Sequence, residues 1–251
     1  MEPLAFGSKL WIKNRNGEIW VEGWDREEVS VSANIRDTER RRVNLAVRRK
    51  GIDLEIEAEY QQPTWTFSFG FVTSPLCDLV VKVPRKVLGY YTTRNGSIFV
   101  GNVEGYSRCE TANGDIRLRD LKGEVWVDTS NGTIEARRLK ARIKGSTTVG
   151  RLILEDVEGG IQLSTTNGEI RASNLEGWGE GISLNSTNGR ISVELGKATG
   201  ELTASNTSGS VDVHLSGVQV LESGKHFVRV RIPGRNQKIT LETIHGSIQV
   251  R

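Results

Sequence analysis

The sequence is poor in the residues that define several common kinds of protein. Among its 251 residues are two cysteines, one methionine and five prolines, and only 36% of the residues are hydrophobic. Cys77 and Cys109 can form one disulfide at most, so the chain is not a disulfide scaffold, and they leave its redox compartment undecided. The few prolines exclude a collagen-like chain, and 28 glycines disfavour a helix bundle.

Long apolar runs and excess charge are also missing. No stretch approaches the length of apolar sequence that a membrane-spanning helix needs, so we expect no membrane span. Residues 1–9 lack the basic and apolar segments of an export signal. Thirty-four Lys and Arg against 31 Asp and Glu leave a formal net charge of +3, which is too small a charge to favour nucleic acid as a partner.

Residues that could support catalysis or bind a metal are few and scattered. The three histidines, His214, His226 and His245, do not combine with the cysteines in a metal-ligand spacing. No acid and base pair recurs on one face, as a hydrolase would need, and no glycine-rich phosphate loop leads into a helix. We therefore predict no catalytic residue, no metal ligand and no cofactor.

What the sequence does contain is a repeat. The pattern Thr-x-Asn-Gly, with degenerate copies, recurs with glycines at positions 96, 114, 132, 150, 168, 189 and 209. Four steps are of 18 residues and the last two are of 21 and 20, which indicates short insertions near 177–181 and 197–200. Asn and Gly suit the left-handed backbone of bends, and stacked Asn side chains can bond to one another. The predicted structural turn residues are Asn95, Gly96, Asn113, Gly114, Asn131, Gly132, Asn167, Gly168, Asn188 and Gly189.

Each repeat divides into two short strands. Aliphatic residues lie two and four positions after the turn glycines, as Ile116 and Leu118 do after Gly114. The second half shows the same alternation, and a further aliphatic residue such as Leu121 lies at the corner between the halves. A period of two indicates strands that bury one face.

Two all-β architectures fit this pattern. In a parallel β-solenoid, or β-helix, each coil has about 18 residues and equivalent side chains stack about 4.8 Å apart. In an antiparallel meander, Asn-Gly would form the hairpin turns that it favours. We predict the solenoid, because the Thr, Asn and Ile positions recur as columns, and we expect right-handed coils from the chirality of parallel crossovers. The meander stays open as the alternative.

The chain is predicted to form one continuous unit with two regions. Residues 1–90 alternate without the strict period and are expected to form an antiparallel β-rich capping region that protects the edge of residues 91–251, the solenoid repeat region. The motif returns at Thr243 to Gly246, so we expect the tail to complete and close the stack. Four tryptophans are expected to pack within the capping region: Trp11, Trp20, Trp24 and Trp65.

Outward positions on the second half of each repeat are the candidates for binding. Alternation places an aromatic and cationic set outward on three successive coils, and such a mixture suits contact with carbohydrate, anionic polymer or protein. An ordinary solvated β surface is the alternative interpretation. The candidate binding face consists of Tyr106, Arg108, Trp126, Arg142 and Lys144.

The order of several short motifs resembles the bacterial putative-adhesin family of unknown function. These motifs are the segment 11–26 around Asn16-Gly17, the acidic strand 52–58, Val-Lys-Val-Pro at 81–84 and the serial Asn-Gly-x-Ile repeats. The resemblance spans nearly the whole chain. It implies a β-solenoid-like fold, an exported or membrane-tethered place in the cell envelope, and no established catalytic residues.

Two functions of different kinds follow. The leading hypothesis is a non-enzymatic cell-envelope protein, an adhesin or recognition module that presents a rigid solenoid surface to protein or cell-wall polysaccharide. The alternative is a cytoplasmic scaffold that self-assembles through the solenoid ends, which the missing export signal favours. An enzyme that acts on polysaccharide is disfavoured because the acid and base pair is missing.

Overall fold

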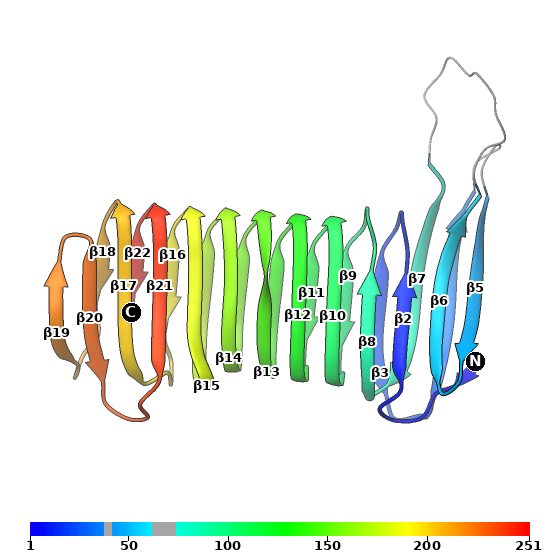
Figure 1. Cartoon of the computed structure of the whole chain (residues 1–251), viewed down its shortest axis with the longest axis horizontal. Coiled ribbons are helices and arrows are strands. Elements are labelled where there is room, and N and C mark those ends of the chain that lie inside the picture. The colour runs from blue at the N-terminus through cyan, green and yellow to red at the C-terminus, as the bar shows by residue number, and fades with distance from the viewer. Residues whose placement is uncertain (38–41, 62–73) are drawn as a thin grey trace, which may run out of the picture.

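The computed structural model describes residues 1–37, 42–61 and 74–251, and the regular elements in these ranges are all strands. The predicted all-β class is therefore confirmed. The strands belong to turns of the chain that stack into a long rod with two layers (Figure 1). No helix that is long and apolar enough to cross a membrane occurs in the described ranges.

The two layers contain the two halves of each turn. The first layer holds, in spatial order, β5 (Val43–Lys50), β6 (Asp53–Tyr60), β2 (Lys9–Lys13), β8 (Lys86–Thr92), β10 (Glu104–Asn113), β12 (Lys122–Asn131), the later parts of β13 (Ile134–Val149), β14 (Leu152–Asn167) and β15 (Ile170–Asn188), then β21 (Lys238–His245), β17 (Gly200–Ser208), β20 (Phe227–Ile232) and β19 (Gln219–Gly224). The second holds β1 (Glu2–Pro3), β4 (Glu28–Arg36), β7 (Leu76–Pro84), β3 (Ile19–Trp24), β9 (Ile98–Gly101), β11 (Ile116–Arg119), the first parts of β13, β14 and β15, then β16 (Ile191–Glu194), β22 (Ile248–Val250) and β18 (Val211–Val213).

Neighbouring turns pair in parallel and in a constant register through the middle of the rod. Ile98 aligns with Ile116, Ile116 with Ile134, and Ile134 with Leu152, each 18 residues further on. The same offset relates the first-layer strands β10, β12 and β13. Because these pairs are parallel, the antiparallel meander is excluded here.

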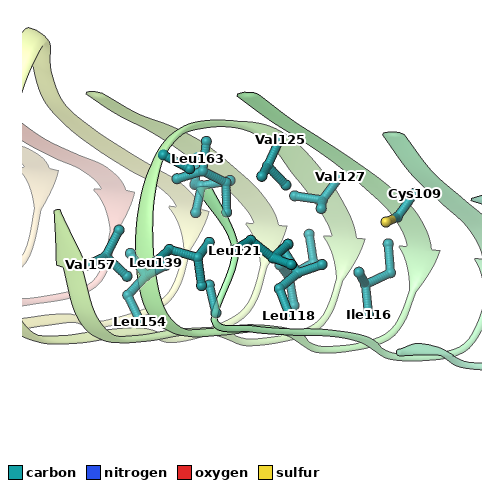
Figure 2. Close-up of a cluster of buried hydrophobic side chains, with 14 of the residues drawn as sticks. Cys109, Ile116, Leu118, Leu121, Val125, Val127, Leu139, Leu154, Val157 and Leu163 are labelled. Atoms are coloured by element: carbon teal, nitrogen blue, oxygen red, sulfur yellow. The ribbon is translucent and has the colours of Figure 1, made fainter. Parts of the chain in front are cut away.

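Inward side chains fill the space between the layers with aliphatic columns (Figure 2). Ile116 and Leu118 lie in the second layer, Val125 and Val127 in the first, and Leu121 at the corner between them; each is at most 2% exposed. Complete burial of one such side chain contributes about 1.5–3 kcal/mol. The alternation seen in the sequence therefore corresponds to one continuous core.

The Thr-x-Asn-Gly corners stack as columns of hydrogen-bonded groups. The Thr111 Oγ1 hydroxyl donates to the Gly96 carbonyl at 3.0 Å, and the Asn113 Nδ2 amide donates to Asn95 Oδ1 at 2.9 Å. A Cβ on Gly114 would lie 2.1 Å from the Gly96 carbonyl oxygen. Close stacking of one turn on the next, rather than backbone conformation alone, thus requires glycine.

Left-handed backbone occurs at the opposite corner, which differs from the expectation that the turn asparagines adopt it. In the described part of the chain, the non-glycine residues with positive φ form one column with φ between 50° and 56°: Asn102, Asp120, Arg138, Asp156 and Asn174. Arg138 donates to both carboxylate oxygens of Asp120, from Nε at 2.8 Å and from Nη2 at 2.9 Å. The short polar side chains of Asn and Asp tolerate this conformation, which explains every residue of the column except Arg138.

Between Asn16 and Asn188 the asparagine column is interrupted at one position, and we expect that closing this gap will stabilise the protein. Val149 aligns between Asn131 and Asn167 and is 49% exposed. Val149→Asn should restore side-chain hydrogen bonds to both neighbours and raise stability by about 1–2 kcal/mol. Thermal denaturation should show a Tm higher by about 2–6 °C. Val149→Asp is the matched control, since it lacks the amide donor, and an equal gain in that variant would contradict the explanation.

At the end of the rod that contains β5, the turns do not follow sequence order. The turn made by β2 and β3 lies between the turn of β6 and β7 and the turn of β8 and β9, and it pairs in parallel with both. Residues 1–90 thus contribute two further parallel turns. The antiparallel cap is smaller than expected and consists of β1, β4 and β5.

The opposite end has the same interleaved arrangement. The turn of β21 and β22 lies between that of β15 and β16 and that of β17 and β18, with parallel pairing on both sides. The expectation that Thr243 to Gly246 closes the stack is therefore corrected, because this segment lies one turn inside. Antiparallel β20 and β19 follow β17 outward.

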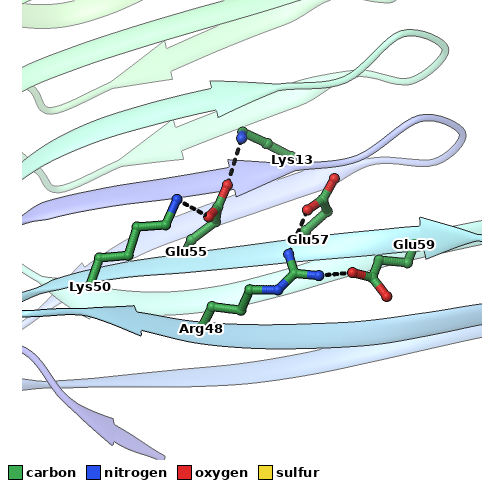
Figure 3. A network of polar contacts seen from close by, with 6 residues as sticks. All are labelled: Lys13, Arg48, Lys50, Glu55, Glu57 and Glu59. Atoms are coloured by element: carbon green, nitrogen blue, oxygen red, sulfur yellow. Dashed lines mark hydrogen bonds and ion pairs between the residues drawn. The ribbon is translucent and has the colours of Figure 1, made fainter.

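A charged cluster joins three strands near the β5 end (Figure 3). The Glu55 side chain is 6% exposed, and its carboxylate lies 2.5 Å from Lys13 Nζ and 2.6 Å from Lys50 Nζ. The hydrogen bond from Lys13, followed by that from Lys50, lowers the pKa of Glu55 to about 2. Arg48 of β5 pairs with Glu57 and Glu59 of β6. These ion pairs attach the edge strand β5 to the stack.

Candidate binding face

One outward position of the first layer carries large side chains on five successive turns. Trp11, Tyr90, Arg108, Trp126 and Lys144 are register partners across β2, β8, β10, β12 and β13. We call these five residues the binding row. Adjacent strands lie about 4.8 Å apart, so the row presents one large side chain per strand along the rod axis.

Aromatic contacts hold part of the row in place. The Trp11 and Tyr90 rings are stacked with centroids 5.6 Å apart, and Tyr106, beside the row on β10, lies 5.4 Å from Tyr90. Lys144 Nζ lies 6.0 Å from the centroid of the Trp126 ring, and Trp126 is 38% exposed. Such pairs restrict the rings, so the surface is preorganised for contact.

The cations of this face are paired within the chain. Arg108 Nη2 lies 2.5 Å from Glu110 Oε1, and the hydrogen bond to Glu110 raises the pKa of Arg108. Arg142 lies 3.4 Å from a carboxylate oxygen of Glu124 and also contacts a second carboxylate. The face is therefore aromatic with neutralised charge, rather than strongly basic.

The structure places all five residues of the sequence-predicted face on this surface. Tyr106 and Arg108 lie on β10, Trp126 on β12, and Arg142 and Lys144 on β13; their side chains are exposed or half-buried. The sequence interpretation did not include two members of the row.

Trp11 and Tyr90 are the members that sequence reasoning missed. Trp11 was expected to pack within the cap, and it lies instead in the row. A signal was present, because both residues stand five positions before a turn asparagine, Asn16 or Asn95, as Trp126 stands before Asn131. The same count along each repeat would have found the whole row.

Trp20 lies on the outward face of the second layer, where it stacks on Phe99 with ring centroids 3.9 Å apart. It is 45% exposed, so the expectation that it packs within the cap was wrong. Trp24 is half-buried, and its indole nitrogen donates to the Glu28 carbonyl at 2.8 Å. Trp65 lies outside the described residues.

The cysteines and two of the histidines, the residue types considered for redox or metal chemistry, are buried or occupy positions within the stacked turns. Cys77 and Cys109 are buried free thiols, and burial raises the pKa of Cys77 to about 11 and that of Cys109 further still. His226 Nδ1 lies 2.8 Å from Asn206 Oδ1, and His245 takes the turn position aligned with Asn188. The described ranges hold no group of three His, Cys, Asp or Glu residues arranged to bind a metal.

Stacked parallel turns with two outward faces place the chain in the β-solenoid-like class of proteins. The family described as Toastrack DUF4097 matches residues 8–251, and the chain belongs to this family. The comparison with curated proteins found no match. Among solved structures, the chain is similar to a putative cell adhesion protein from Clostridium sporogenes ATCC 15579, with 14% identity, a TM-score of 0.31, and coverage of 100% of this chain and 95% of that chain.

Proposed function

We propose that the protein is a non-enzymatic recognition module of the bacterial cell envelope that binds cell-wall polysaccharide along its binding row. The observation that carries the proposal is the alignment of Trp11, Tyr90, Arg108 and Trp126 on four successive turns. Right-handed coiling is part of the same proposal and rests on the chirality of parallel crossovers.

A linear periodic row suits a polymer. Each turn offers a large side chain at the same outward position, so a chain of repeating units can make a similar contact at every step. Aromatic rings contact the apolar C–H faces of sugars, while Arg108, the Trp11 indole and the Tyr90 hydroxyl supply hydrogen bonds. A rigid stack also loses little conformational freedom on binding.

The two outer strands of the first layer favour recognition over self-assembly. β5 carries three consecutive exposed cations, Arg48 to Lys50, and each is paired with a carboxylate of the same chain. At the other end, β19 is irregular in register between Val220 and Glu222. Charges and bulges on edge strands discourage pairing with another chain. End-to-end assembly is therefore the less supported function.

Binding to purified peptidoglycan sacculi, measured by sedimentation, tests the proposal. Trp126→Ala and Tyr90→Ala should each reduce the bound fraction several-fold, because each removes a contact of the row. Trp20→Ala is the matched control, since Trp20 is as exposed but lies on the opposite face. Its binding should equal that of the parent. Failure of the parent to bind, or equal binding by all the folded variants, would refute the proposal.

Cell location tests the second part of the proposal. Fractionation and protease shaving of intact cells should find the native gene product at the envelope. A cytoplasmic product would overturn the envelope role, and light scattering for concentration-dependent filaments would then test the scaffold.

A further inference from the structure

A glycine-rich insertion folds back over the end of the binding row. Gly159 aligns with Gly177, but Ile161 aligns with Ile182, so this turn of β15 contains three additional residues. Glycines at 177, 179 and 181 surround Trp178 and Glu180, and Trp178 is 38% exposed. Gly179 has φ of 67° with no atom near its Cβ position. The segment is thus a glycine-flanked excursion on the surface of the first layer.

The carboxylate of Glu180 is held by three side chains from two earlier turns. Lys144 Nζ lies 2.8 Å from Glu180 Oε2, and Gln162 Nε2 donates to the same oxygen at 2.9 Å. Arg142 Nη2 lies 3.5 Å from Glu180 Oε1. We call Arg142, Lys144 and Gln162 the cradle. The hydrogen bond from Lys144 is the main cause that lowers the pKa of Glu180, so its carboxyl is ionised at neutral pH.

The cradle belongs to the surface that we propose as the polymer-binding face. Lys144 is the last member of the binding row and lies over the Trp126 ring, while Gln162 is its register partner on the next turn. A polymer that follows the row from Trp11 to Trp126 therefore reaches the cradle at its next contact. At the cradle the polymer meets Glu180, which already pairs with Arg142 and Lys144.

We infer that the cradle is a binding site for the carboxylate of an acidic polysaccharide, and that Glu180 is an internal occupant which this carboxylate displaces. The inference rests on the proposed function and specifies its ligand. The three side chains already hold a carboxylate, so the site has the geometry and charge for this group. An uncharged sugar that displaced Glu180 would leave Lys144 and Arg142 without a carboxylate at this position.

Displacement is physically feasible because the ion pair is accessible. The side chains of Glu180 and Arg142 are 37% and 39% exposed, and that of Lys144 is 22% exposed. Water and salt weaken ion pairs at such partly exposed sites. Gly179, which has open space around its Cβ position, allows the middle of the segment to take other backbone conformations. As a tethered competitor, Glu180 lowers the apparent affinity for any external carboxylate.

The aromatic neighbours favour a polysaccharide over an acidic peptide as the source of the carboxylate. Trp126 lies on β12, the strand before the cradle strands β13 and β14, and Trp178 lies on β15, the strand after them. Sugar rings present apolar faces that aromatic side chains contact, whereas an extended acidic peptide would present mainly charge. An acidic peptide is therefore included in the test as a competing outcome.

Isothermal titration calorimetry with the hexamer of galacturonic acid tests the inference directly. Glu180→Gln should bind the hexamer about tenfold more tightly than the parent, because the competing charge is removed. Lys144→Gln combined with Glu180→Gln should lose this gain. Glu158→Gln is the matched control, since Glu158 forms a similar exposed ion pair with Lys140 outside the cradle, and its affinity should equal that of the parent.

Three outcomes would overturn the inference. The first is that Glu180→Gln binds hexagalacturonate no more tightly than the parent does, which includes no binding at all. The second is that neutral maltohexaose binds as tightly as hexagalacturonate. The third is that a hexaglutamate peptide binds more tightly than hexagalacturonate. Hydrogen exchange supplies a second readout, since saturating hexagalacturonate should increase exchange at 177–181 in the parent. Unchanged exchange there would contradict displacement.

These results are separable from the sacculus experiment. If sacculus binding depends on Trp126 while Glu180→Gln gains nothing, the inference fails and the proposed function stands. If Glu180→Gln gains affinity for hexagalacturonate while the parent does not bind sacculi, the proposed polymer is wrong and the cradle stands.

Discussion

Deleting residues 236–251 should unfold a segment more than twice as long as the one removed. The deletion takes away β21 and β22, which lie between the turn of β15 and β16 and the turn of β17 and β18. β17 and β18 then lose their parallel partner, and only the antiparallel hairpin of β19 and β20 stays attached to them. The remaining sheet of β17, β20 and β19 has an apolar face that only the three-residue strand β18 can cover, so it is marginal in water. We expect residues 200–232 to unfold.

Hydrogen exchange measured by mass spectrometry would show this result. Amides of 200–232 should exchange as in an unfolded chain, while those of 98–167 should keep their protection. In the full chain, Leu241→Asp should have the same effect, because Leu241 is buried, and Thr240→Asp at the neighbouring outward position should not. Retained protection of β17 after the deletion would show that it can pair directly with β15.

The second large effect is expected at the centre of the stack. Ile134 is 0% exposed and lies between Ile116 and Leu152 in one inward column. Ile134→Asp would bury a charge without a partner, and we expect a loss of more than about 4 kcal/mol of stability. For a chain of this length, the loss corresponds to a fall in Tm of at least about 8 °C.

Urea denaturation of Ile134→Asp and Ile134→Val separates charge from packing. The valine variant removes one methylene and should lose about 0.5–1.5 kcal/mol. A similar midpoint for the aspartate variant and the parent would mean that position 134 does not face the core. Asn131→Ala, at the nearby corner, should have a smaller effect than Ile134→Asp, because it removes exposed hydrogen bonds such as that to Asn113 Oδ1.

The regular part of the fold could be predicted because each turn repeats the same sequence pattern of corner residues and alternating aliphatic residues. Alternation around Ile116 and Ile134 specified strands, and the 18-residue spacing specified their stacking. The interleaved ends could not be predicted in the same way. The motif at Thr243 to Gly246 resembles the other corners, so local sequence does not specify which turn it contacts. Its place depends on long-range pairing with Asn188 and Ser208.

The candidate binding face likewise has features that could be predicted from the sequence and features that could not. The outward direction of Trp126 and Lys144 followed from alternation alone. The contact of Glu180 with Lys144 could not be inferred, because it depends on how a three-residue insertion folds across two turns. Ion pairing of the cations likewise depends on neighbours on other turns, such as Glu124 beside Arg142.

The interleaved end made by β21 and β22 also imposes an order in time. In a simple stacked repeat, each new turn can dock on the one before it as soon as it is synthesised. Here residues 200–213 are made first but must leave a space beside β15 and β16 for a turn that arrives later. If they docked at once, the stack would be mispaired by one turn, since Gly209 and Gly246 end similar motifs. Escape from that trap, rather than formation of the regular turns, is expected to limit the rate of folding.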